Sequence, residues 1–246
     1  MDNPTYIALS RMDAQQRAMS VLANNLANTT TAGFKAGHLQ FADYLSRTNG
    51  GNQAAGEKND AYVQDRATYR DFTQGTLQQT GNQLDIAITG AGFFSVMTSE
   101  GVRLTRNGRF QRLSDGSITD AAGNALLDRT GQPITLRPED HTISIASDGT
   151  ISTESGVAGE IGLVRVENNY TLHGEGNELF SASTPTTQMD TKELRQGMLE
   201  GSNVNSMTEM TNLVQLQRDY QITANFIDGE STRRQNAIDK ITQTQS

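Results

Sequence analysis

The sequence predicts an α+β protein in which long helices at the N- and C-terminal ends form a coiled-coil-like pair around a central all-β domain. Near both ends, apolar residues recur at steps of three and four, which keeps their side chains on one narrow seam of a helix. Between the ends, short apolar segments alternate with glycine-containing turns, a pattern typical of a β-sandwich or β-barrel. The middle of the chain offers neither stripe an obvious partner, so we expect the helices to pair with each other, with further copies, or with both.

We assign residues 1–33 to the N-terminal helix and the turn that ends it. Asn3 can accept hydrogen bonds from free N–H groups of the first turn, and Pro4 stands where a proline is tolerated. The helix is expected to end at about Asn28, because three threonines and then Gly33 follow. Its expected seam residues are Met12, Met19, Leu22 and Leu26.

Residues 34–74 have weaker periodicity, and we assign them to an extended connector. The glycine- and asparagine-rich run at 49–56 is a flexible loop by composition. Aromatic residues on both sides of that run indicate that the segment packs against something; they are Phe41, Tyr44, Tyr62, Tyr69 and Phe72.

Residues 75–190 carry the strand signals and form the predicted central β-domain. Leu84, Ile86 and Ile88 alternate with other residues, and further short apolar segments follow between Asn-Gly and Asp-Gly turns. The hexapeptide at 114–119 (SDGSIT) recurs at 147–152 as SDGTIS. Two copies are too few for a solenoid, so the repeat predicts one hairpin used twice.

We assign residues 191–246 to a C-terminal connector and helix. The segment from Ser206 to Glu209 fits the S-x-x-E capping box, which satisfies two backbone N–H groups at a helix start. The helix is expected to continue to about Thr242, weakened near its middle by Gly229. Its expected seam residues are Met210, Leu213, Tyr220 and Ile227.

Both seams contain glutamines, at Gln15 and Gln217. An amide is a poor choice for a dry core, but it can form hydrogen bonds between helices and fix their register. On this ground we favour packing between subunits over a purely internal helical hairpin, which remains the alternative.

The composition excludes several classes of protein. The formal net charge is −8 and the basic residues are scattered, which disfavours binding to nucleic acid. There is no cysteine, so disulfide and thiol chemistry are excluded. No apolar run approaches the ~20 residues that a membrane-spanning helix needs, so no membrane insertion is expected. The N-terminus also lacks the apolar core of a cleaved signal peptide.

We expect no catalytic, cofactor-binding or metal-binding residues. His38, His141 and His173 lie far apart and in no metal-ligand spacing. The Gly-Ala-Gly at 90–92 lacks the rest of a dinucleotide fingerprint and is better read as a tight turn.

Paired carboxylates leave a glycan hydrolase as a minor alternative. Such an enzyme needs two carboxyl groups across the scissile bond, and five aspartates of the β-region are available: Asp85, Asp115, Asp120, Asp128 and Asp148. Most of them stand in turn positions, where aspartate is expected to bind backbone N–H groups.

Four segments resemble the bacterial flagellar rod and hook proteins. The first is 21–35 (VLANNLANTTTAGFK), which resembles the family's N-terminal signature, and the last is 199–205 (LEGSNVN), which resembles its C-terminal motif. Between them, 75–88 and 105–110 resemble strand segments of the family. The motif residues that we expect to shape the chain where each helix meets the β-domain are Asn24, Asn25, Asn28, Gly33, Phe34, Glu200, Gly201, Ser202 and Asn203. We expect Gly33 to adopt a backbone angle closed to other residues.

The resemblance implies a structural role without catalysis. Members of this family leave through the flagellar type III export apparatus without a cleaved signal peptide, and they assemble with copies of themselves and with neighbouring rod proteins. Their terminal helices form an inner tube in the periplasmic rod of the basal body, and the β-domain lies outside it. We therefore expect a subunit that transmits torque for motility.

Within the family, the start of the chain at 2–11 (DNPTYIALSR) looks most like the proximal-rod members. The alternatives are a distal-rod or short hook-type subunit. A secreted β-domain binding module, in which the terminal helices merely pair, is a rival from another class.

Overall fold

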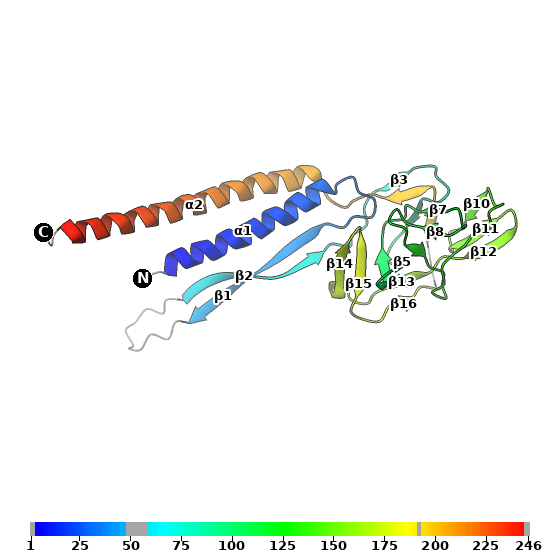
Figure 1. Ribbon diagram of the computed structural model, residues 1–246, viewed down its shortest axis with the longest axis horizontal. Helices are drawn as coiled ribbons and strands as arrows, with labels where there is room; N and C mark the ends of the chain where they lie inside the picture. The colour runs from blue at the N-terminus through cyan, green and yellow to red at the C-terminus, as the bar shows by residue number, and fades with distance from the viewer. Residues whose placement is uncertain (1–2, 48–58, 191–192, 244–246) are drawn as a thin grey trace. The chain divides into compact units, whose positions relative to one another are not determined.

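The computed structural model describes residues 3–47, 59–190 and 193–243, which fold into two compact units (Figure 1). The helical unit comprises Met1–Ala27, Gly37–Tyr69 and Asn205–Ser246. The β-unit comprises Asn28–Ala36 and Arg70–Val204. The two helices and the β-rich region between them confirm the predicted α+β class.

The helical unit contains two helices and a strand pair. Helix α1 spans Asn3–Ala27 and helix α2 spans Ser206–Gln243. They run antiparallel, because Arg234 donates a hydrogen bond to Thr5 (2.8 Å) and Glu209 accepts one from Asn25 (3.2 Å) at the other end. Strands β1 (Gly37–Arg47) and β2 (Asn59–Arg70) form a two-stranded sheet in the segment expected as a connector. Helix α1 contacts both α2 and β1.

The start of α2 differs from the predicted capping box. The side-chain Oδ1 of Asn205 accepts hydrogen bonds from the N–H groups of Met207 (3.1 Å) and Thr208 (3.2 Å). The capping residue is therefore Asn205 rather than Ser206, one position earlier than predicted. The carboxylate of Glu209, which the capping box would direct to the start of the helix, instead accepts a hydrogen bond from the side chain of Asn25. Helix α2 continues through Gly229 without a break.

The β-unit is built from short antiparallel strands. Its longest sheet follows the order β14-β15-β6-β5-β9-β8-β7, with β13 joining β5 to β16, and β10-β11-β12 forms a separate three-stranded sheet. Strand β4 pairs with β17, and β3 pairs with β18. The elements are β3 Leu77–Gln79, β4 Ile86–Ile88, β5 Phe93–Thr98, β6 Gly101–Thr105, β7 Gln111–Arg112, β8 Ile118–Thr119, β9 Ala125–Leu126, β10 Ile143–Ile145, β11 Thr150–Thr153, β12 Gly156–Glu160, β13 Leu163–Arg165, the short helix η1 Asn169–Thr171, β14 Leu172–Gly176, β15 Leu179–Ala182, β16 Thr187–Gln188, β17 Leu194–Gln196 and β18 Met198–Glu200.

The core of the β-unit lies under these strands in two apolar clusters. The larger one includes Phe94 and Phe110, whose rings meet edge to face at 5.3 Å, a favoured aromatic geometry. The smaller one includes Phe93 and Phe180, with Phe72 packed against both. The expectation that the segment around residue 72 packs against another part of the chain is met at Phe72; the side chains of Phe41, Tyr44 and Tyr62 lie outside the described residues.

The repeated hexapeptide forms the same turn twice, as predicted. In each copy the aspartate accepts a hydrogen bond from the N–H two residues later, Asp115 from Ser117 (3.0 Å) and Asp148 from Thr150 (2.9 Å). The glycine that follows each aspartate has a positive φ, 87° and 91°. The turns connect β7 to β8 and β10 to β11, which are antiparallel pairs.

Candidate functional site

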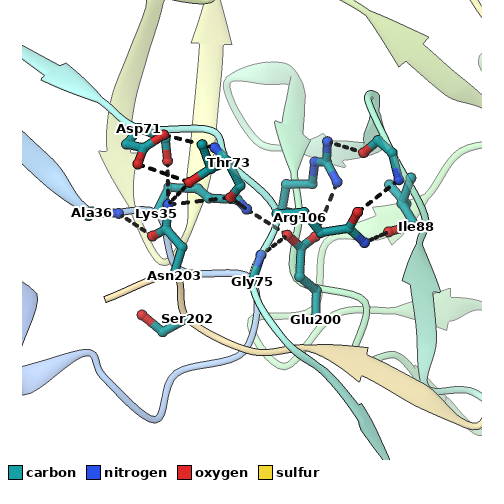
Figure 2. Close-up of polar contacts among 12 residues, drawn as sticks. Lys35, Ala36, Asp71, Thr73, Gly75, Ile88, Arg106, Glu200, Ser202 and Asn203 are labelled. Atoms are coloured by element: carbon teal, nitrogen blue, oxygen red, sulfur yellow. Dashed lines mark hydrogen bonds and ion pairs between the residues drawn. The ribbon is translucent and has the colours of Figure 1, made fainter. Parts of the chain in front are cut away.

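A buried cluster of charges joins three chain segments within the β-unit (Figure 2). The carboxylate of Glu200 binds Lys35 through Oε1 (2.6 Å) and Arg106 through Oε2 (3.1 Å). The three side chains are 0%, 0% and 3% exposed, for Glu200, Lys35 and Arg106 in that order. We call these residues the ion triad. They come from the end of β18, from the segment after α1, and from the turn after β6.

Backbone groups complete the coordination of the triad. Oε1 of Glu200 also accepts a hydrogen bond from the N–H of Gly75 (3.0 Å). Nζ of Lys35 donates to the carbonyl of Thr73 (2.7 Å). Both oxygens of the carboxylate are thus occupied, which offsets part of the cost of removing this charge from water.

Arg106 reaches a second set of partners. Its Nη2 donates to the carbonyl of Gly90 (2.8 Å), and its guanidinium lies over the ring of Phe93, 5.2 Å from the centroid. Its Nε is buried and has no hydrogen-bond partner among the described residues. Glu200 is therefore the main source of compensation for this buried cation.

The triad carries two positive charges and one negative charge. Burial lowers the pKa of Lys35, and the Glu200 carboxylate opposes this shift, while the charge of Arg106 adds to it. Burial likewise lowers the pKa of Arg106, again opposed by Glu200. The position of Glu200 between them is what makes two buried cations tolerable.

Asn203 ties the same segments together without charge. Its Oδ1 accepts a hydrogen bond from the N–H of Ala36 (2.8 Å). Its Nδ2 donates to the carbonyl of Asp71 (2.8 Å) and to the hydroxyl of Thr73 (3.1 Å). One amide thus links the segment after α1, the segment after β2 and the segment before α2.

Two glycines allow the segments to approach closely. Gly33 has φ of 70°, and a Cβ there would lie 2.4 Å from the backbone nitrogen of Asn107. A Cβ on Gly75 would lie 2.0 Å from the carbonyl oxygen of Gly201. The backbone angle of Gly33 is the one that the sequence analysis expected, and the close approach is a second reason for glycine.

In the helical unit, Asn25 plays a comparable part. Its side chain is buried, and its amide both accepts from the N–H of Gly37 (2.9 Å) and donates to the carbonyl of the same residue (2.9 Å). The third bond goes to the carboxylate of Glu209. Asn25 thereby connects α1, β1 and α2.

Comparison with known proteins identifies the family. Three family models match the chain: "Flagella basal body rod protein" over residues 6–35, "Flagellar hook protein FlgE/F/G D1 domain" over 87–153, and "Flagellar basal body rod FlgEFG protein C-terminal" over 195–239. The flagellar basal-body rod protein FlgF of Caulobacter vibrioides is 35% identical over 246 residues, covering 98% of each chain. The chain belongs to the flagellar basal-body rod protein family.

Further relatives support the same family. FlgF of Mesorhizobium japonicum is 32% identical over 242 residues, covering 97% of each chain. FlgG of Bacillus subtilis is 31% identical and covers 90% of this chain and 92% of its own. These matches confirm the family that the motifs predicted, and they make the chain a structural rod protein most like FlgF.

The family-motif residues fall into two groups in the structure. Asn25, Gly33, Glu200 and Asn203 are the residues with the bonds described above. The others have smaller roles: Phe34 is buried under the guanidinium of Arg70 (5.3 Å), Asn28 accepts from the Thr31 hydroxyl (3.1 Å), Gly201 donates to Thr76 (2.8 Å), the Ser202 hydroxyl accepts from Val204 (3.2 Å), and Asn24 is exposed.

The predicted seam residues lie mostly between full burial and full exposure. Met12, Met19, Leu22, Leu26, Leu213, Tyr220 and Ile227 are half-buried, and Met210 is 52% exposed. The most buried positions of α2 are Glu209 and Thr223. The inner face of α2 within one chain therefore runs through 209, 213, 216, 220, 223 and 227, and Met210 lies outside it.

Several residues of the site had no role in the sequence analysis. Lys35, Arg106 and Gly75 lie within the motif segments but were not singled out, and Asp71 and Thr73 were missed. The available signal was the presence of a lysine, an arginine and a glutamate inside motifs of a rod-like protein. Their pairing could not be read from spacing, because Glu200 is 165 residues from Lys35 and 94 from Arg106.

The aspartates of the hydrolase alternative bind groups of their own turns. Asp115, Asp120, Asp128 and Asp148 each accept a hydrogen bond from a backbone N–H two residues later. Asp85 accepts one from the side chain of Asn82 (3.1 Å). Turn formation thus accounts for these carboxylates, as the sequence analysis expected. Within the described ranges, no group of three or more His, Cys, Asp or Glu residues could hold a metal ion, and no helix is long and apolar enough to cross a membrane.

Proposed function

We propose that the chain is a proximal-rod subunit of the bacterial flagellar basal body, and that it polymerises through its terminal helices with copies of itself and with neighbouring rod proteins. Relatives named FlgF match it over 97–98% of its length, whereas FlgG of Bacillus subtilis matches over 90%. This difference favours the proximal-rod assignment over the distal-rod alternative. The work of such a subunit is to transmit torque rather than to turn over a substrate.

The observation that carries this proposal is the apolar side of α2 that the chain leaves exposed. Val214, Ile222 and Phe226 are 43%, 66% and 48% exposed; Val214 and Ile222 lie on the side away from Glu209 and Thr223, and Phe226 lies at the edge of that side. Met207 and Met210, 74% and 52% exposed, extend this surface toward the start of the helix. Exposed apolar residues that gather on one side of a helix indicate an interaction surface. We call these five residues the outer stripe of α2.

A further copy or a neighbouring rod protein would cover the outer stripe with its own helix. The three- and four-residue steps of the chain's two helices suit coiled-coil packing, in which two or more helices wind around each other. Contacts that repeat head to tail with a rotation that does not close produce a helical tube. We also propose that the subunit reaches the periplasmic rod through the flagellar export apparatus, as the family resemblance implies.

A pair of substitutions tests the use of the outer stripe. In V214D and F226D, a carboxylate would be buried at the proposed interface, so we expect loss of swimming in soft agar and loss of rods from isolated basal bodies. The matched control is N212D, which adds the same charge on an exposed position of the same helix. Normal swimming by V214D and F226D would contradict the proposal.

A further inference from the structure

We propose that the ion triad imposes an order on the docking of two segments of the β-unit that adjoin the helices: residues 28–36 dock on the rest of the β-unit only after residues 198–204 have done so. Residues 28–36 follow α1 in the chain, and residues 198–204 precede α2. This inference concerns the folding of one chain and does not depend on the proposed function.

The segment at 198–204 has its own attachment to the β-unit. Strand β18 pairs with β3 in the register Met198–Gln79 to Glu200–Leu77. The pairing continues when Gly201 donates to the carbonyl of Thr76 (2.8 Å). None of these bonds involves residues 28–36, so this segment can dock first.

The segment at 28–36 bonds partly to residues 70–71, because the carbonyls of Lys35 and Ala36 accept from Arg70 (2.8 Å) and Asp71 (2.9 Å), and partly to the other segment. The N–H of Gly33 donates to the carbonyl of Glu200 (2.7 Å), and the N–H of Ala36 donates to Asn203 (2.8 Å). The ammonium of Lys35 binds the carboxylate of Glu200. Three bonds of this short segment therefore end on residues 200–203.

Charge makes the dependence one-sided. Without Glu200, Lys35 would enter a buried site that already holds Arg106, and two uncompensated cations would lie close together. Without Lys35, Glu200 still has Arg106 and the N–H of Gly75 as partners. The loss of Glu200 should therefore release residues 28–36, whereas the loss of Lys35 should leave residues 198–204 in place.

Two matched glycine substitutions separate the segments. In G33A the new methyl group meets the backbone of Asn107 at 2.4 Å, so it disturbs the docking of 28–36. In G75A it meets the carbonyl of Gly201 at 2.0 Å, so it disturbs the docking of 198–204. Both variants add one methyl group, but they displace different segments, and at Gly33 the positive φ adds backbone strain to the steric clash.

The experiment is amide hydrogen exchange, read by mass spectrometry on the full chain, for wild type, G33A, G75A, K35M and E200Q. In G33A and K35M, exchange should become at least about tenfold faster in residues 28–36, whereas residues 198–204 should keep their exchange rates. In G75A it should become faster in both 28–36 and 198–204. In E200Q it should become faster in 28–36, with the strand amides of 198–201 changed less. Peptides from 118–166 report whether the β-core stays folded.

Three results would overturn the inference. One is a release of 198–204 in G33A or K35M that equals the release of 28–36. Another is continued protection of 28–36 in G75A or E200Q. The third is uniform loss of protection through 118–166 in all four variants, which would show that the segments and the β-core order as one unit.

Discussion

At the scale of single residues, the structure concentrates its buried polar groups where chain segments meet. Glu200 serves two cations and a backbone N–H, and Asn203 serves three separate acceptors and donors. In the helical unit, the amide of Asn25 likewise joins separate segments, through hydrogen bonds to Gly37 and Glu209. Such groups are costly when a partner is removed, since the remaining group stays buried and unsatisfied.

Removal of the Asn25 amide should destabilise the helical unit. We expect N25A to lower the free energy of unfolding by about 1–3 kcal/mol, because the N–H and carbonyl of Gly37 lose their partner. The measurement is urea unfolding of the full chain, followed by helical circular dichroism. The control N24A changes the exposed neighbouring asparagine and should have a smaller effect. Equal losses in the two variants would contradict the role given to Asn25.

At the scale of elements, the helices were the easiest part to predict. The periodicity placed both of them, and α1 ends at Ala27, one residue before the expected end. The start of α2 was placed one residue late, because the sequence offers Asn205 and Ser206 as adjacent capping candidates. The face of α2 that is buried within one chain was not predicted, since buried Glu209 and Thr223 are polar and did not stand out in an apolar pattern.

The corrected cap is directly testable. N205A should destabilise α2 by about 1 kcal/mol, because the N–H groups of Met207 and Thr208 lose their acceptor. S206A should cost less, since Asn205 supplies the cap. The comparison is made by thermal unfolding of both variants. A larger loss in S206A would restore the capping box that the sequence predicted.

Short strands and turns were predictable as a class but not in their pairing. The repeated turns at Asp115 and Asp148 follow from local chemistry, in which an aspartate and a glycine determine the backbone path. The pairing of β18 with β3, and of β17 with β4, joins residues more than 100 positions apart. Local patterns carry no information about such pairs, and the ion triad was missed for the same reason.

At the scale of the whole molecule, the carboxylates of the turns give stability a dependence on acid. Hydrogen bonds from the hydroxyl and N–H of Ser117 lower the pKa of Asp115 below its ordinary value. A hydrogen bond from Ser155 lowers that of Asp140, and one from Thr142 lowers that of Glu154. A lowered pKa means that the unfolded chain binds protons first as the pH falls.

The contribution of these three carboxylates to stability should therefore be constant above about pH 5 and fall as the pH drops through about 4 toward the folded-state values. The measurement is the free energy of unfolding as a function of pH. A triple variant, D115N/D140N/E154Q, should show a shallower fall, because these groups no longer titrate. An identical pH profile in the variant and the wild type would remove these carboxylates from the explanation.

The central claim is that the outer stripe of α2 is covered when subunits assemble, and the absence of cysteine from the chain makes this claim simple to measure. A single cysteine in place of Val214 or Phe226 can be labelled with a maleimide, first in the purified monomer and then in isolated basal bodies. The account predicts rapid labelling in the monomer and protection by at least about tenfold in the assembled rod. Equal labelling in both states would contradict it.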